Sequence, residues 1–356
     1  MKKIIFFLLL VFVISILILI NPFQRNNQAE VELIDTSNRK GVALIITGAA
    51  ARISQEVALL EELDRRGLLN NIVFISGVSS GALNSVVLNG ILDKKITWDE
   101  YKDLLFKLKT SDIFIQNGKK IPVNTSPARA LYTKIAEERL GFRTIGDLEH
   151  TTSITITRFK NAGLKRIDYR ICSLPINKES DTSMGLVDIM MATSAFPVVF
   201  PPVKIKNAKS IPDGYFVDGG AGNDRVPYRA LMEFEKYRGI GVEKVYIVSR
   251  NCDSMPDLSE ELRGIGINDK GIFDKLGFSL DVLLTKELIK KLNQYTIEAP
   301  ELSKRTYIWI PDFKADFLLF NFDDLEKQYS LTKEWAEKHD PVLLEDYLKL
   351  YSKTKK

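Results

Sequence analysis

The chain has 356 residues, of which 45% are hydrophobic and 27% are charged, and its formal net charge at pH 7 is +4. This composition is typical of a globular protein with enough length for one large core or two smaller ones, and it excludes a disordered chain. The small net charge excludes an electrostatic footprint for nucleic acid, and two cysteines, Cys172 and Cys252, are too few for a zinc cluster or a disulfide scaffold.

The first twenty residues form a hydrophobic segment. Lysines at positions 2 and 3 precede residues 4–20, which are apolar apart from Ser15. A run of this length lies between a signal-peptide core and a membrane span, and no small-residue cleavage site follows it. We expect residues 1–20 to be a retained membrane anchor rather than a cleaved signal. Residues 21–39 are then a linker, and residues 40–356 form a hydrolase domain on the extracytoplasmic side.

Two strand-helix units open this domain. Residues 41–47 (GVALIIT) are an apolar, β-branched run that suits a strand covered on both faces, and a helix is expected at 53–66. A second strand, at 71–76, is followed by a helix that begins at Ser80. Two such units in succession predict a parallel sheet with right-handed crossovers.

A serine lies on the bend between the second strand and its helix. In the spacing Gly77-x-Ser79-x-Gly81, larger residues in place of the glycines would collide with the central residue of a sharp strand-to-helix turn. Such a turn exposes the hydroxyl near the start of the helix, where free N–H groups favour negative charge. Ser79 is therefore a candidate nucleophile, and the alternative is an ordinary glycine-rich turn with a capping serine.

The rest of the chain alternates between strand and helix patterns. Strands are expected at 151–158, 167–173, 215–217, 242–249 and 305–310. Helices are expected at 126–140, 185–193, 227–237, 272–292, 324–338 and 341–351. Residues 161–163 are expected to form the turn of the first strand pair. The proline-containing stretch 196–202 cannot continue a helix, and we expect it to lie against the site.

A serine nucleophile needs a base, which is most often histidine. The chain has only His150 and His339, and neither ends a convincing strand. Asp218 follows a strand, and Gly219 and Gly220 allow a tight exit in which the carboxylate projects toward a neighbouring strand end. Asp218 is therefore the candidate base, although an Asp-Gly-Gly turn also has a purely structural interpretation.

The sequence resembles the patatin-like phospholipases in three spaced motifs, which are Gly48-Ala49-Ala50-Ala51-Arg52, Gly77-Val78-Ser79-Ser80-Gly81 and Asp218-Gly219-Gly220. The stretch 192–202 (ATSAFPVVFPP) is similar to the family's segment between nucleophile and aspartate. Asn223 and Pro227 are similar to the Asn and Pro that follow the family's aspartate. The resemblance covers residues 40–249.

The resemblance implies a three-layer α/β/α sandwich with a mainly parallel central sheet. It implies a serine lipid acyl hydrolase, a phospholipase or esterase without metal or organic cofactor, whose partners are a phospholipid or other acyl-lipid substrate and the membrane. The residues it implies are a catalytic dyad of Ser79 and Asp218, oxyanion-hole N–H groups on Gly48, Ala49 and Ala50, and supporting residues Arg52, Gly77, Gly81, Gly219 and Gly220.

The oxyanion loop departs from the family pattern of three glycines, any residue, Arg and Gly. Ala49 and Ala50 replace the second and third glycines, and Ile53 replaces the last. A positive φ costs an alanine about 1 kcal/mol or more, so one alternative is a catalytically impaired, membrane-tethered lipid-binding protein. Another is an α/β-hydrolase esterase with His339 completing a triad, although that fold places its nucleophile deeper in the sheet.

Overall fold

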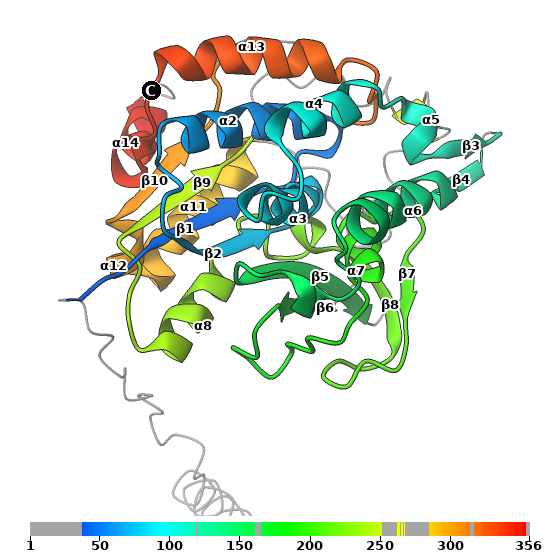
Figure 1. Cartoon of the computed structure of the whole chain (residues 1–356), viewed down its shortest axis with the longest axis horizontal. Helices are drawn as coiled ribbons and strands as arrows, with labels where there is room; N and C mark the ends of the chain where they lie inside the picture. The colour runs from blue at the N-terminus through cyan, green and yellow to red at the C-terminus, as the bar shows by residue number, and fades with distance from the viewer. Residues whose placement is uncertain are drawn as a thin grey trace, which may run out of the picture.

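The computed structural model describes residues 38–118, 120–160, 165–250, 262–263, 265, 267, 285–313 and 317–353. Within them, a nine-stranded sheet has the order β11-β10-β9-β1-β2-β5-β8-β7, with β6 also paired to β5 (Figure 1). Its strands are β1 (Val42–Ile46), β2 (Ile72–Gly77), β5 (Thr152–Lys160), β6 (Lys165–Cys172), β7 (Val203–Ile205), β8 (Gly214–Asp218), β9 (Lys244–Val248), β10 (Thr306–Trp309) and β11 (Val342–Leu343). A separate hairpin consists of β3 (Ile115–Asn117) and β4 (Lys120–Asn124).

The sheet is parallel at its centre and antiparallel toward its edges. Strands β10, β9, β1, β2 and β5 run parallel to one another. Strands β6 and β8 are antiparallel to β5, β7 is antiparallel to β8, and β11 is antiparallel to β10. The expectation of a mainly parallel central sheet is confirmed.

Helices cover both faces of the central strands (Figure 1). The even-numbered residues of β1 pack with α2 (Ile53–Arg65), α3 (Ser80–Leu92) and α13 (Leu325–Lys338) on one face. Residues Ala43 and Ile45 of the same strand pack with α8 (Arg229–Arg238), α11 (Thr285–Glu298) and α12 (Pro300–Ser303) on the other. Because both faces are covered, every residue of β1 is apolar and buried. The predicted three layers are present.

A third group of helices packs around β5 and the end of the sheet near β7 and β8 (Figure 1). It consists of α4 (Trp98–Phe106), α5 (Thr110–Ile113), α6 (Ser126–Thr133) with its continuation η3 (Lys134–Arg139), and α7 (Leu186–Thr193). Shorter turns are η2 (Ala50–Arg52), η4 (Ile145–Asp147) and η5 (Gly219–Ala221), and the described chain ends in α14 (Leu344–Lys353). This group surrounds the cavity described below.

Most of the expected elements are present, with a few differences. The helix expected at 126–140 widens after residue 133 into a π-type turn. Strands β3, β4, β7 and β11 were not predicted. For β3, β7 and β11 the reason is that segments of two or three residues carry no periodicity. The turn expected at 161–163, the first part of the helix expected at 272–292, and Cys252 lie outside the described residues. Cys172 is a buried free thiol whose pKa burial raises to about 12.

The structure corrects the prediction of a membrane anchor and an extracytoplasmic domain. In the ranges that the structure describes, no helix has the length and apolar character needed to cross a bilayer. The longest α-helices there, α11 and α13, have 14 residues each. At 1.5 Å per residue such a helix spans about 21 Å, against a hydrocarbon core of about 30 Å. Residues 1–20, to which the anchor was assigned, lie outside the described residues.

Candidate active site

Strand β5 brings the ends of β2 and β8 together. Strand β2 runs parallel to β5 and ends where Gly77 pairs with Ile154. Strand β8 runs antiparallel to β5 and ends where Asp218 pairs with Ile156. Strand β6 occupies the opposite edge of β5 at both places, so β2 and β8 share one edge. The two strands therefore point at each other across a single residue of β5, Thr155.

Ser79 lies on a strained turn between β2 and α3. Its φ of 55° and ψ of −131° lie in a sparsely populated region, where a non-glycine residue costs about 1–3 kcal/mol. Thr193, at the end of α7, holds this turn in place. The Ser79 N–H donates to Thr193 Oγ1 at 2.9 Å, and that hydroxyl donates to the Thr155 carbonyl at 2.8 Å. The candidate nucleophile, Ser79, is thus fixed to the same residue of β5 that separates β2 from β8.

Glycines around Ser79 are required by close approach. A Cβ on Gly77 would lie 2.6 Å from the carbonyl oxygen of Gly81, and a Cβ on Gly81 would lie 2.4 Å from that of Thr47. A Cβ on Gly48 would lie 2.9 Å from Ser79 Cβ. The Gly-x-Ser-x-Gly spacing is therefore a packing requirement of this turn.

Asp218 is a buried carboxylate beside Ser79. It is 4% exposed, and its Oδ1 accepts the Gly220 N–H at 2.7 Å. Burial raises the pKa of Asp218 to about 6, and the Ser79 hydroxyl and the N–H groups of Gly220 and Ala221, which lie close enough to stabilise the ionised carboxylate, oppose a larger rise. A carboxylate with this pKa is ionised at neutral pH and is a stronger base than an exposed aspartate.

The predicted oxyanion loop follows β1 and lies against Ser79. The Ala49 N–H donates to Ser80 Oγ at 2.7 Å, so this donor is engaged within the protein. The N–H groups of Gly48 and Ala50 are the loop's other backbone donors, and both residues line the same cavity as Ser79. Of the three predicted donors, we therefore assign the oxyanion role to Gly48 and Ala50 in the mechanism proposed below.

A chain of buried polar side chains lies behind this loop. Ser80 Oγ, which accepts the Ala49 N–H, donates to Glu56 Oε2 at 3.4 Å. Asn84 Nδ2 donates to the same carboxylate at 3.0 Å, and the Tyr101 hydroxyl donates to Asn84 Oδ1 at 2.6 Å. All four side chains are buried. Because they belong to α2, α3 and α4, the loop is fixed to three helices.

The C-terminal part of the chain closes the outer side of the oxyanion loop. Arg52 is fully buried and donates from Nη2 to the Phe317 carbonyl at 2.6 Å. The Ala51 N–H donates to the Leu319 carbonyl at 2.8 Å, and Gln328 of α13 donates to the Ala51 carbonyl at 3.0 Å. Arg52 therefore anchors a segment that the sequence resemblance did not cover.

Ala50 occupies backbone that favours glycine. Its φ is 49°, whereas Ala49 has an ordinary φ of −128°. We expect Ala50→Gly to raise the free energy of unfolding by about 0.5–1 kcal/mol, because relief of left-handed strain exceeds the entropy that glycine adds to the unfolded chain. Ala49→Gly is the matched control and should lower it by about 0.5–1 kcal/mol. Urea unfolding measures both, and shifts of the same sign would contradict this account.

A cavity of about 870 Å³ opens above Ser79 and Asp218. Its remaining wall is largely apolar and is formed by helices α3 to α7 and two loop segments. Among its lining side chains are Leu83, Val87, Leu104, Leu108, Ile113, Leu131, Ile135, Met190, Met191, Phe196, Phe200, Leu319, Phe320 and Phe322. The stretch 196–202 lies against the site as expected. A cavity of this size and character suits the hydrocarbon part of a ligand.

Some residues of the site were not predicted individually. Thr193 belongs to the ATSAF stretch quoted above, but nothing in the sequence indicates that its hydroxyl holds the Ser79 turn. Tyr132 of α6 lines the cavity, and burial, with the nearby charge of Asp218, raises the pKa of Tyr132 to about 12. Its only sequence signal is a place in an amphipathic helix.

Neither histidine lies at the site. His339 is exposed at the end of α13, where it stacks on Trp335 and contacts the carbonyl of that residue at 2.7 Å. His150 lies 3.4 Å from Asp93. Neither is among the described residues that line the cavity, so the structure does not favour a Ser-Asp-His triad. The described part of the chain also holds no cluster of three or more residues suited to a metal ion.

One family model and several solved structures are similar to this chain. The family model of the patatin-like phospholipases matches residues 44–232. VipD from Legionella pneumophila is 10% identical, with a TM-score of 0.40 over 85% of this chain and 67% of that chain. The type III effector ExoU is 10% identical, with a TM-score of 0.39 over 88% of this chain and 53% of that chain. In the ExoU–SpcU complex from Pseudomonas aeruginosa, the matching chain is 15% identical, with a TM-score of 0.32 over 75% of this chain and 59% of that chain. This chain thus spans about two thirds of the VipD chain and about half of the ExoU chain. No curated protein matches the sequence.

Proposed function

This chain belongs to the patatin-like phospholipase family, whose model matches residues 44–232, and on that premise we propose that it hydrolyses phospholipid esters with a dyad of Ser79 and Asp218. One observation carries the proposal. The side chain of Ser79 lies close enough to the buried carboxylate of Asp218 to lower its pKa, and both residues line a largely apolar cavity. A nucleophile, a base and a lipid-sized space therefore coincide.

The proposed reaction has two steps. Ser79 Oγ attacks the ester carbonyl while Asp218 accepts its proton, and the N–H groups of Gly48 and Ala50 stabilise the oxyanion. Asp218 then returns the proton to the departing alcohol. The acyl group remains bonded to Ser79 Oγ. In the second step Asp218 takes a proton from water, the hydroxide attacks the acyl-enzyme, and the proton returns to Ser79 Oγ as the fatty acid leaves.

The base must be ionised to accept a proton. Burial raises the pKa of Asp218 to about 6, so the fraction of active enzyme falls as the pH falls through this value. The proposed mechanism thus has an acid limb near pH 6 in the profile of kcat/KM.

The cavity wall also supports a phosphate-bearing substrate. Arg225 and Arg250 line the cavity and are 6% and 2% exposed. A guanidinium group in such a position suits the phosphodiester of a phospholipid, which a neutral acylglycerol lacks. We therefore favour phospholipids over neutral lipids as the substrate class.

The test compares two monomeric esters with the same acyl chains. Full-length protein is given dihexanoylphosphatidylcholine or dihexanoylglycerol, and released hexanoate is measured, with Ser79→Ala as the control. We expect kcat/KM for the phospholipid to be higher by about tenfold or more, as one charge-assisted hydrogen bond provides. A preference for the neutral ester would contradict the phospholipid assignment. Failure to release hexanoate from either ester would contradict hydrolysis.

A second candidate, a lipid-binding protein without turnover, is favoured by one observation. The Ala49 N–H is donated to Ser80 Oγ rather than left for the oxyanion, and loss of one such donor typically costs about 2.7–4 kcal/mol of transition-state stabilisation. A fluorophosphonate probe separates the two candidates. Covalent labelling of Ser79 supports the hydrolase, and lipid binding without labelling supports the binding protein.

A further inference from the structure

The segment after the proposed base, residues 219–224, turns back across β5 and β6. A Cβ on Gly219 would lie 2.4 Å from the Thr155 carbonyl oxygen of β5. A Cβ on Gly222 would lie 2.2 Å from Asp168 Oδ1 of β6. The segment, here called the 219–224 loop, therefore lies directly on the two strands, with no space for side chains at these points.

Three charged side chains of β6 share the face on which this loop lies. Arg166, Asp168 and Arg170 occupy alternate positions of the strand, so all three point to one side of the sheet. Tyr169 and Ile171 point to the other side, where they join the apolar core with β5. We call the three charged residues the β6 ladder.

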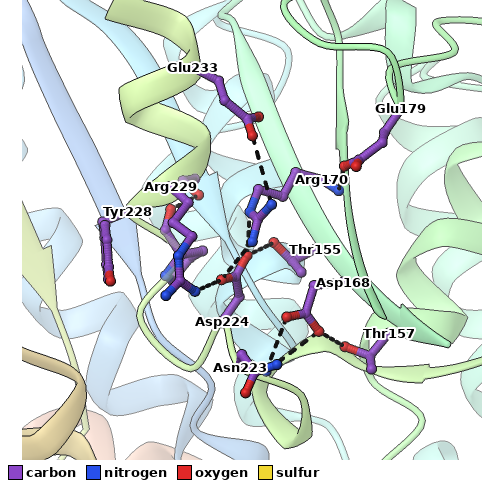
Figure 2. A network of polar contacts seen from close by, with 12 residues as sticks. Thr155, Thr157, Asp168, Arg170, Glu179, Asn223, Asp224, Tyr228, Arg229 and Glu233 are labelled. Carbon is purple, nitrogen blue, oxygen red and sulfur yellow. Dashed lines mark hydrogen bonds and ion pairs between the residues drawn. The ribbon is translucent and has the colours of Figure 1, made fainter. Parts of the chain in front are cut away.

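Each member of the β6 ladder contacts a different residue of the loop. Arg166 Nη1 donates to the Ala221 carbonyl at 3.3 Å. The Asn223 N–H donates to the Asp168 carboxylate at 3.3 and 3.4 Å (Figure 2). Arg170 Nε forms an ion pair with Asp224 at 2.6 Å (Figure 2). Alternate residues of β6 thus contact successive points along the loop, from Ala221 to Asp224.

Asp224 fixes the far end of the loop. Its side chain is fully buried, and its carboxylate pairs with Arg170 and, at 3.0 Å, with Arg229 of α8 (Figure 2). Thr155 Oγ1 also donates to it at 3.3 Å. Arg229 is held in turn by Glu298 of α11 at 2.9 Å. A buried carboxylate with two arginine partners is a rigid anchor, because separating it from an arginine would leave a buried charge without its partner.

We propose that the β6 ladder is a positioning device for Asp218, which it serves by holding the 219–224 loop so that the Gly220 and Ala221 N–H groups reach the carboxylate. The inference rests on the proposed function of Asp218 as base. Among the described residues that line the cavity, no member of the ladder is found. The ladder therefore acts through Asp218 and not on the substrate.

The pH of the acid limb in the profile of kcat/KM should therefore depend on the ladder. The two loop N–H groups stabilise the ionised carboxylate, so their displacement raises the pKa of Asp218 above about 6. The other polar groups that interact with Asp218 are the Ser79 hydroxyl and Tyr132 of α6, and Arg225 and Arg250 line the same cavity. Ser79, Tyr132 and Arg250 belong neither to the ladder nor to the loop, whereas Arg225 directly follows the loop.

Asp168 is a ladder member that also interacts electrostatically with several neighbouring groups. Burial and the charge of Asp224 raise the pKa of Asp168, while Thr157 Oγ1, which donates at 2.6 Å, and the Arg170 charge oppose that rise. Lys291 of α11 also lies within electrostatic range of both carboxylates. Replacement of Asp168 therefore disturbs an ionic group as well as the loop, and a second variant is needed.

The experiment uses Arg166→Met and Asp168→Ala, with Lys165→Met as the matched control. Lys165 neighbours Arg166 on β6 and is exposed, so the control removes the same charge without reaching the loop. We expect each ladder variant to lower kcat by roughly 10- to 100-fold, with KM changed less than about twofold, because small misplacement of a catalytic group slows chemistry rather than binding. The acid limb should move to higher pH in both variants and stay in place in the control.

A second readout does not require turnover. In protein labelled with ¹³C at aspartate carboxyl carbons, the Asp218 signal, assigned with Asp218→Asn, gives its pKa directly by NMR titration. A higher pKa in both ladder variants supports the positioning role even when no ester is hydrolysed, which separates the inference from the proposed function. A pKa of Asp218 equal to that of Lys165→Met in both ladder variants would overturn it.

Discussion

Ser79→Ala and Asp218→Ala are each expected to lower kcat for phospholipid hydrolysis by about 10⁴- to 10⁶-fold, the range found when a member of a serine catalytic unit is removed. The reason is that, in the proposed mechanism, Ser79 Oγ supplies the attacking oxygen and the nearby Asp218 carboxylate accepts its proton. His339→Ala is expected to leave kcat within about twofold, because that side chain is exposed beyond α13 and away from the cavity. Release of fatty acid by the three purified variants measures the effects.

Folding must be separated from chemistry in this comparison, and Asp218→Asn does so. Because burial raises the pKa of Asp218 to about 6 in the folded protein, its contribution to stability is complete below the unfolded pKa of about 4. That contribution is lost as the pH rises through 6, and ionisation at pH 7 costs roughly 3 kcal/mol. The amide removes this cost, so Asp218→Asn should be inactive yet at least as stable as wild type. An inactive variant with a lower free energy of unfolding at pH 7 would contradict this account, as would strong loss of activity in His339→Ala.

Asp224→Ala is expected to lower the free energy of unfolding by about 3–5 kcal/mol, which is typical when one partner of a buried ion pair is removed. The change leaves Arg170 and Arg229, whose side chains are only 13% and 23% exposed, without their shared carboxylate. Urea unfolding at pH 7 measures the loss.

The chain offers a matched control for this prediction. Asp188 pairs with Arg129 at 2.7 Å, and the two side chains are 51% and 47% exposed. Asp188→Ala should therefore cost no more than about 1 kcal/mol. Losses of equal size in the two variants would show that the burial of Asp224 does not matter.

The local part of the site could be predicted from the sequence. Gly77 is required by contacts within its own turn, which depend on residues close in the chain, whereas Gly81 is also required by the carbonyl of Thr47 after β1. The sequence also showed that a positive φ in the loop would fall on an alanine. In the structure Ala50 has a positive φ and Ala49 does not. Such features follow from backbone sterics alone.

The long-range part could not be predicted in the same way. Alternation along β6 is visible in the printed sequence, but which loop covers Arg166, Asp168 and Arg170 depends on the pairing of β5 with both β6 and β8. The contacts of Arg52 with Phe317 and of Ala51 with Leu319 join segments that are far apart in the chain and carry no shared pattern. The membrane anchor was predicted from the apolar run, the lysines before it and the lack of a cleavage site after it, and the correction came from the lengths of the described helices.

The head-to-head arrangement of β2 and β8 separates the chemistry of this protein from its selectivity. The gap between the two proposed catalytic positions is set by the repeat of one strand, since Gly77 and Asp218 pair with residues of β5 that are two apart. The chain between them supplies α4, α5, α6 and α7, which shape much of the cavity. Evolution can therefore lengthen, shorten or reshape those helices to fit a new acyl chain, while the distance from nucleophile to base stays constant.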